Sequence, residues 1–252
     1  MAFLETSGLT KAFGRMVAVD HVDLTVRAGE LTAIIGPNGA GKTTFFNVVT
    51  GKLRPTAGRV RIQGDDITGL PPHAVVRRGI GRSFQVTNLF PGLSVLDSVR
   101  VAVLSQRGLT GRILPSRARA RAAQEEAERL LQELGLERHG HHPCGTLSHA
   151  DQRAVEIGLA LAARPRLLLL DEPTAGMGPE ETAAMVGLMQ RLARRDGLTV
   201  LLVEHDMRVV FALAERIVVM HQGRIIADGP PAAVREDAGV RKAYLGEPGA
   251  RG

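Results

Sequence analysis

The chain has 252 residues, 44% of them hydrophobic, with a formal net charge of +6 and a single cysteine. This length suits one large domain, or one domain with an appended lobe. No apolar run approaches the ~18–20 residues that span a bilayer. The first residues lack the pattern of a signal peptide, and Cys144 alone cannot form an internal disulfide. We therefore expect a soluble, intracellular protein.

The positive charge does not by itself indicate a nucleic-acid partner. The basic residues are mostly arginines scattered among Asp and Glu, and their densest run, 117–121, opens a predicted helix. The chain has only 7 Phe, 1 Tyr and no Trp, which leaves little for stacking on bases. We expect no nucleic-acid partner, although an anionic membrane surface or ligand would not be repelled.

The N-terminal segment, residues 4–26, alternates short apolar runs with turns and predicts strands of an antiparallel sheet edge. Phe13 lies in this segment and is followed by a turn residue. An aromatic face can stack on a base, but the segment alone favours a partly buried core side chain.

Residues 36–44 match the phosphate-binding loop pattern G-x-x-x-x-G-K-[ST] at every fixed position. A predicted buried strand, 30–35, precedes the loop, and a predicted helix, 43–50, follows it. Glycines allow successive N–H groups to converge on an anion, and the helix N-terminus adds its positive dipole end. The pattern predicts binding of a nucleoside triphosphate, with Lys42 on the β- and γ-phosphates and the Thr43 hydroxyl on Mg²⁺. The predicted binding residues are Gly36, Pro37, Asn38, Gly39, Ala40, Gly41, Lys42, Thr43 and Thr44.

A strand at 58–64 and a short helix at 71–79 are predicted next, and a β-like run then ends at Gln85. The Gln85 amide oxygen could ligate Mg²⁺ or hold a water molecule. From residue 86 to 163 the pattern becomes helical and predicts an α-helical lobe inserted into the α/β core. Within it, Ser94 and Asp97 predict the start of a helix that ends near Leu104.

Residues 117–134 carry apolar side chains at helical spacing, with three glutamates mostly away from that face: Glu125, Glu126 and Glu128. The cluster of His139, His141, His142 and Cys144 matches no zinc spacing, and its histidines are interpreted as solvated loop residues. Ser148 predicts the N-cap of a helix that continues through Ala163, and the same helix start could hold a γ-phosphate.

Two buried strands end in polar residues. The strand at 166–173 ends in Asp171, placed to hold Mg²⁺, and Glu172, placed to orient or deprotonate a water molecule. The strand at 199–206 ends in His205, which the carboxyl end of a parallel strand would place in the ligand crevice. A hairpin at 217–227 and helices at 231–236 and 240–245 complete an α/β fold with a mostly parallel sheet.

In this order and spacing, these motifs resemble the ATP-binding subunits of ABC transporters over nearly the whole chain. The resemblance implies a single ABC ATPase domain at 1–246, with the helical lobe at about 86–163, and a tail at 247–252. It implies Phe13 as the adenine-stacking residue, and Ser148, Ala150 and Gln152 as signature residues that contact nucleotide. It also implies Lys42, Glu172 and His205 as catalytic residues, with Thr43, Gln85 and Asp171 at the metal.

A narrower resemblance is to the longer ATPase subunit of branched-chain amino acid importers. Five segments and the extra residues at 105–116 carry it: 17–20, 82–85, 89–95, 204–207 and 243–246. Relatives in that branch import urea or short amides, and efflux cassettes are also similar. The usual Leu-Ser-Gly-Gly-Gln signature is altered at His149-Ala150-Asp151, and the loop at 174–179 lacks a frequent Asp.

The resemblance implies ATP and Mg²⁺ as ligands and a second ABC ATPase subunit, identical or different, as partner. It further implies transmembrane permease subunits, contacted through a groove near Gln85–Leu93, a solute-binding protein acting indirectly, and a peripheral place on the cytoplasmic membrane face. Soluble ABC ATPases of DNA repair or translation are a rival class. Repair members carry a long coiled coil, whereas only 63 positions separate Gln85 from Ser148, and translation members carry two cassettes.

Overall fold

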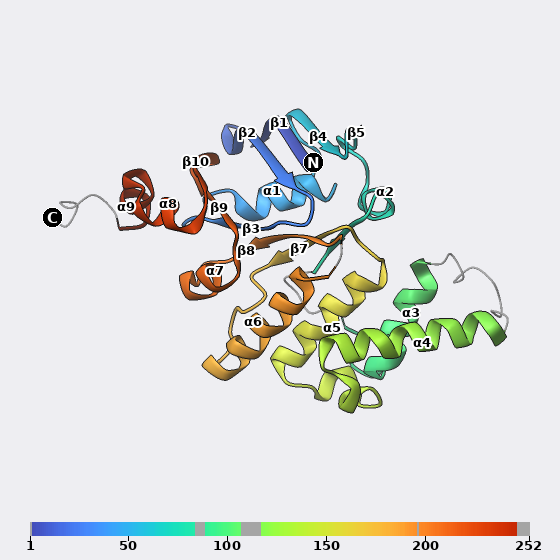
Figure 1. Cartoon of the computed structure of the whole chain (residues 1–252). Helices are drawn as coiled ribbons and strands as arrows, with labels where there is room; N and C mark the ends of the chain where they lie inside the picture. The colour runs from blue at the N-terminus through green and yellow to red at the C-terminus, as the bar shows by residue number, and fades with distance from the viewer. Residues whose placement is uncertain (1, 84–88, 107–116, 196, 246–252) are drawn as a thin grey trace.

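The computed structural model describes residues 2–83, 89–106, 117–195 and 197–245, without the side chains of 242–245 (Figure 1). An antiparallel sheet has the order β2-β1-β4-β5. Its strands are β1 (Ala2–Phe13), β2 (Met16–Arg27), β4 (Ala57–Ile62) and β5 (Asp65–Asp66). The predicted antiparallel strands are therefore present, and they form a sheet of their own.

A second sheet has the order β10-β9-β3-β8-β7-β6. Its strands are β3 (Leu31–Ile35), β6 (Ile80–Arg82), β7 (Leu167–Asp171), β8 (Thr199–Val203), β9 (Arg216–His221) and β10 (Arg224–Gly229). Neighbouring strands from β9 to β6 are parallel, and β10 pairs with β9 antiparallel. Because parallel strands end at the same edge, the residues that follow β3, β7 and β8 come together there.

Side chains of the central strands alternate between two hydrophobic cores. In β7, Leu168 and Leu170 belong to the core shared with the helices α5 and α6, whereas Leu167 and Leu169 belong to the core shared with α1 and the antiparallel sheet. This two-residue period is the pleat of a strand buried on both faces. Asp171 continues the second series and so lies on the side of α1.

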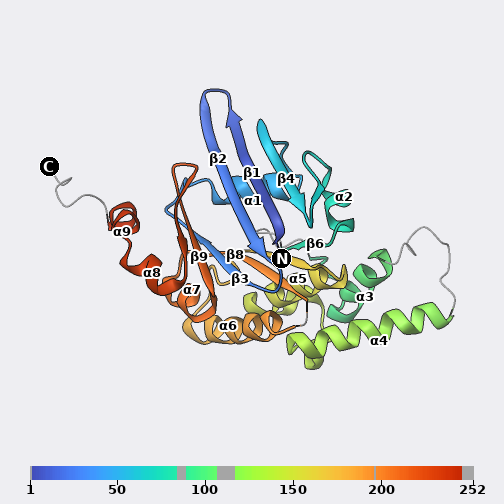
Figure 2. The ribbon, with the colours of Figure 1, turned by 45° about the horizontal axis from the view of Figure 1, so that its top comes forward.

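The helices lie on both faces of the six-stranded sheet (Figure 1). On one face α1 (Lys42–Val49) lies between the two sheets, and α5 (His149–Ala162) and α6 (Pro179–Ala193) cover the opposite face. Figure 2 shows α3 (Val95–Gln106) and α4 (Arg117–Leu134) extending to one side beyond α5. The remaining helices are α2 (Pro72–Arg77), α7 (Met207–Leu213), α8 (Pro231–Glu236) and α9 (Ala238–Leu245), with short 3₁₀ turns at Glu137–His139 and Cys144–Thr146.

The helix α4 departs from its predicted pattern at one acidic residue. Its apolar side chains Ala127, Leu130 and Leu131 are buried as expected. Glu126 is also buried, however, and accepts a 2.7 Å hydrogen bond from Nε of Arg164. The prediction that this glutamate faces away from the apolar face is wrong, because a cation at the end of α5 compensates the burial of its carboxylate.

Candidate functional site

The phosphate-binding loop joins β3 to α1. Gly41 is the N-cap of α1 with a left-handed backbone (φ 99°) and no side-chain cap. The first N–H groups of the helix therefore remain available to an anion at the loop. Nζ of Lys42 donates to the carbonyl oxygens of Gly36 (2.6 Å) and Pro37 (3.1 Å), so the lysine folds back over the loop.

Lys42 is buried beside the acidic end of β7. Burial lowers the pKa of Lys42, and the negative charges of Glu172 and Asp171 oppose that shift. The three groups are thus close enough to interact, although they come from two distant parts of the chain. An ammonium group that has left water is placed to bind phosphate as a point charge.

Asp171 is fully buried at the end of β7. Its Oδ2 accepts a 2.9 Å charge-assisted hydrogen bond from Arg82, the last residue of β6. Its Oδ1 is buried and has no hydrogen-bond partner among the described residues. A buried carboxylate oxygen without a donor is suited to a cation or to a water bound to one.

Glu172 and His205 lie at the ends of neighbouring strands. Glu172 has a left-handed backbone (φ 47°), which a residue with a Cβ seldom adopts. Its Oε2 lies 3.9 Å from Nδ1 of His205, and both side chains remain partly open to solvent, at 29% and 60% exposure. The pair therefore borders a space that a water molecule and a ligand can reach.

Glu204 holds the two loops that carry these side chains. It is fully buried; its Oε1 accepts from the N–H (3.1 Å) and the hydroxyl of Thr174, and its Oε2 from the N–H groups of His205 (2.9 Å) and Asp206 (3.4 Å). The role of Glu204 was not predicted from the sequence. An acid directly before a strand-end histidine was the available signal, but its partner Thr174 is 30 positions away.

The altered signature forms the start of α5. Oγ of Ser148 accepts from the N–H of Asp151 (3.1 Å) and donates to its carboxylate (2.9 Å), so the N-cap is confirmed. Gln152 donates to the carbonyl of Leu147 (3.2 Å), and Ala150 is half-buried. Farther along α5, Arg153 is paired with Glu156 at 2.7 Å and reaches the Glu172 carbonyl at 3.5 Å.

Two predicted site residues, Phe13 and Gln85, and the histidine cluster lie apart from the contacts described above or outside the described residues. Phe13 ends β1 with 44% exposure, and Nζ of Lys11 lies 5.0 Å from its ring centroid. Gln85 lies outside the described residues. Among the part of the chain that is described, no group of three His, Cys, Asp or Glu side chains is arranged to hold a metal, so the histidines at 139–142 form no such group with Cys144.

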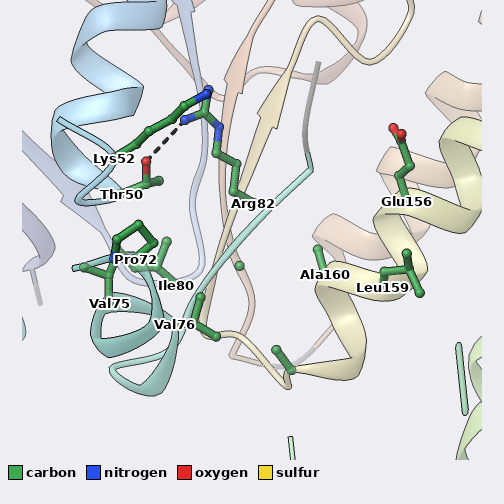
Figure 3. Close-up of a pocket in the computed structure, with 12 residues that line it drawn as sticks. Thr50, Lys52, Pro72, Val75, Val76, Ile80, Arg82, Glu156, Leu159 and Ala160 are labelled. Carbon is green, nitrogen blue, oxygen red and sulfur yellow. Dashed lines mark hydrogen bonds between the residues drawn. The ribbon is translucent and has the colours of Figure 1, made fainter. Parts of the chain in front are cut away.

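A groove of about 460 Å³ opens beside this site, between α2 and α5 (Figure 3). Arg82 lies on its floor and donates to Oγ1 of Thr50, as the dashed line in Figure 3 marks. Apolar side chains form most of its walls, from α2 on one side and α5 on the other: Pro72, Val75, Val76, Leu159 and Ala160.

No helix of the described residues is long and apolar enough to cross a membrane.

Known proteins resemble this chain over almost all of its length. The ABC transporter family model matches residues 19–175, and the model named branched-chain amino acid ATP-binding cassette transporter matches residues 224–250. The branched-chain amino acid transport ATP-binding protein BraF of Pseudomonas aeruginosa is 42% identical, covering 97% of this chain and 98% of that protein. LivG of Salmonella typhimurium, of the same description, is 39% identical with the same coverage. The lipopolysaccharide export ATP-binding protein LptB of Escherichia coli is 39% identical, covering 98% of each.

Solved structures agree with these relatives. A nucleotide-free ATP-binding cassette from an ABC transporter superposes with a TM-score of 0.84 at 31% identity, covering 98% of this chain and 100% of that one. A dimeric cassette bound to ADP and phosphate, in a post-hydrolysis state, gives 0.75 at 28% identity, covering 90% of this chain and 98% of that one.

The family match and the geometry lead to the same conclusion. The loop over α1, the acidic end of β7 and the histidine after β8 meet at one edge of a mostly parallel sheet. The chain belongs to the ABC transporter family and is one of its nucleotide-binding ATPase subunits.

Proposed function

We propose that the chain powers the import of branched-chain amino acids or a related small polar solute, as a peripheral subunit on the cytoplasmic face of a membrane. ATPase activity is supported by one observation: four residues lie together at one edge of the sheet, namely Lys42, Asp171, Glu172 and His205. The solute class rests on the BraF and LivG relatives and on the family match at 224–250.

In this mechanism, the residues of the loop and of two strand ends have separate tasks. Lys42 exchanges its bonds to loop carbonyls for the β- and γ-phosphates of ATP, and Phe13 stacks on the adenine. Glu172 accepts a proton from the attacking water, and His205 orients that water and senses the γ-phosphate. The 3.9 Å between Glu172 and His205 lets both reach one water molecule.

The chemistry of the proposed ligands fits Mg²⁺. The free Oδ1 of Asp171 and the hydroxyl of Thr43 are hard oxygen ligands of the kind Mg²⁺ prefers, and Gln85 would complete the set. When bound, Mg²⁺ neutralises phosphate charge as a Lewis acid.

The partner subunit completes the site. The chain has one phosphate-binding loop and one signature, and we propose that Ser148, Ala150 and Gln152 serve the ATP of a second ATPase subunit. Ser148 caps the N–H of Asp151 at the start of α5, where Ser148 and His149 are exposed, and the positive end of the helix dipole acts within about one turn of that start. Closure on two ATP molecules would then move α5 and the groove beside it.

The groove between α2 and α5 is the proposed contact with the transmembrane permease subunits. Its apolar lining suits a partner helix, and Arg82 connects its floor to Asp171. The predicted contact segment Gln85–Leu93 lies partly outside the described residues, and in its described part Phe90 is 69% exposed.

Reconstitution tests the proposal. The chain is purified together with the membrane subunits that it binds, and the complex is placed in proteoliposomes that contain ATP and a solute-binding protein. We expect uptake of leucine, isoleucine or valine that stops with Glu172→Gln. Uptake of urea or short amides alone would move the assignment to that branch. If the co-purified membrane subunits instead extract lipopolysaccharide, the 39% identity to LptB reflects function and import is wrong.

A further inference from the structure

Arg82 joins three elements of the core through one guanidinium group. One terminal nitrogen donates to Asp171 Oδ2 at 2.9 Å. The other donates to Asn47 Oδ1 at 2.7 Å and to Thr50 Oγ1 at 3.2 Å, both on or directly after α1. The guanidinium carbon lies 5.7 Å from the Phe46 ring centroid, and the side chain is only 9% exposed.

These contacts determine how the Asp171 carboxylate is oriented. One oxygen is held by Arg82, and the other is buried with no hydrogen-bond partner among the described residues. A carboxylate at a strand end can rotate about its Cα–Cβ and Cβ–Cγ bonds, and a donor on one oxygen removes that freedom. Arg82 is itself held by Asn47, Thr50 and Phe46. The side chain of Asp171 is therefore held in one orientation, and Oδ1 points in one direction.

Arginine suits this task and lysine does not. The guanidinium is planar and presents donors in a fixed fork, so it can bind α1 and Asp171 at the same time. Lysine has one nitrogen on a flexible stem and lacks the fixed fork that joins the two partners here. If Arg82 acted only through its positive charge, a lysine at this position would serve equally well.

We propose that Arg82 is a positioning residue of the metal site, which holds Asp171 so that its free oxygen faces the Mg²⁺ of bound ATP. The inference rests on the proposed metal site and deepens it. Ligands of a metal are oriented by outer partners, whose loss typically costs about 10–100-fold in metal affinity.

The test measures Mg²⁺ affinity directly in the purified, full-length chain. A fluorescent, non-hydrolysable ATP analogue is bound in EDTA, and in parallel Mg²⁺ is titrated at a fixed analogue concentration. We expect Arg82→Lys and Arg82→Met both to raise the Kd for Mg²⁺ by about 10-fold or more. The Kd of the analogue in EDTA should change by less than about 2-fold, since Arg82 contacts none of the predicted phosphate-binding residues.

Arg166→Lys is the matched control. Arg166 also stacks on a phenylalanine, with its guanidinium carbon 5.7 Å from the Phe3 ring centroid, and donates to a side-chain amide at 2.8 Å. It does not contact Asp171, so its replacement should leave the Kd for Mg²⁺ unchanged. Thermal unfolding of each variant separates loss of fold from loss of metal affinity.

Three results would overturn the inference. Unchanged Mg²⁺ affinity in both Arg82 variants would make the residue a structural link only. A normal value for Arg82→Lys with a change for Arg82→Met would show that charge, not orientation, matters. If neither variant folds, Asn47→Leu is used instead, because it removes the hydrogen bond from Arg82 to Asn47. An unchanged Kd for Mg²⁺ in Asn47→Leu would also contradict the positioning role of Arg82. If wild-type binding shows no Mg²⁺ dependence, the metal site itself fails instead.

Discussion

Glu172 is the residue whose replacement separates binding from chemistry. Its side chain is partly exposed beside His205, and its backbone is held in a left-handed conformation that a substitution to glutamine leaves unchanged. We expect Glu172→Gln to retain ATP and Mg²⁺ binding, to lower phosphate release by ~10²–10⁴-fold and to trap an ATP-bound dimer. Phosphate release is compared with equilibrium nucleotide binding, and near-normal hydrolysis would exclude the catalytic role.

Lys42 should behave in the opposite way. Its ammonium group, now bonded to two loop carbonyls, is expected to bind phosphate with a charge-assisted bond. Lys42→Ala should therefore weaken nucleotide binding by about 1.5–3 kcal/mol, the range for hydrogen bonds to charged groups. Isothermal titration measures this change, and an unaltered affinity would count against the phosphate-binding assignment.

Glu204 gives a prediction on stability. Its carboxylate accepts four hydrogen bonds from the two loops around the site. The amide of Glu204→Gln can accept only on its oxygen, which leaves donors unpaired at a fully buried position and should cost about 1–3 kcal/mol of unfolding free energy. Urea unfolding measures this loss of unfolding free energy. The control Thr174→Ser keeps the hydroxyl and should retain most of the stability, and equal losses in both variants would exclude the proposed hydrogen-bond role.

At the scale of elements, the phosphate-binding loop is shaped by glycines with positive φ. Gly41 has φ 99°, and a Cβ there would lie 2.2 Å from the carbonyl oxygen of Ala18 in β2. Gly39 has φ 79° but no atom within 4 Å of a built Cβ, so it is the matched control. Gly39→Ala should cost about 1–2 kcal/mol of stability from the backbone alone, and Gly41→Ala an additional ~1–3 kcal/mol from the clash. Equal losses in chemical unfolding would show that β2 does not restrict the loop.

Elements with a strong local pattern could be predicted from the sequence. The bounds of α4 follow from its helical period, and the run of leucines predicts β7, although β7 spans Leu167–Asp171 rather than 166–173. Ser94 and Ser148 carry local cap signals that the structure bears out. The structure describes α3 as far as Gln106, two residues beyond the expected Leu104, and residues 107–116 lie outside the described part of the chain.

The unpredicted contacts join residues that are distant in the chain. Arg82 and Asp171 are 89 positions apart, and Glu126 and Arg164 are 38 apart. Such pairs are determined by how elements pack, and no local period or spacing signals them. The boundaries of the helical lobe and the roles of individual site residues stay predictions, as does Gln85, which lies outside the described residues.

At the scale of the whole molecule, the six-stranded sheet separates two hydrophobic cores and brings the site residues to one edge. The signature lies at the start of α5 on the opposite face from α1 (Figure 1). This arrangement agrees with two half-sites in one chain, each completed by the partner subunit.

We propose that this chain supplies half of two different ATP sites, and the turnover of each site can be measured separately. A complex of this chain with its partner ATPase carries a Glu→Gln change at the catalytic position of one subunit, so that only one site turns over. Ala150→Gly in this chain removes a Cβ at the start of α5 and permits closer approach to phosphate. We expect faster hydrolysis at the site built on the partner's phosphate-binding loop, and nearly unchanged hydrolysis at the site bearing Lys42. A gain confined to the Lys42 site would contradict this proposal.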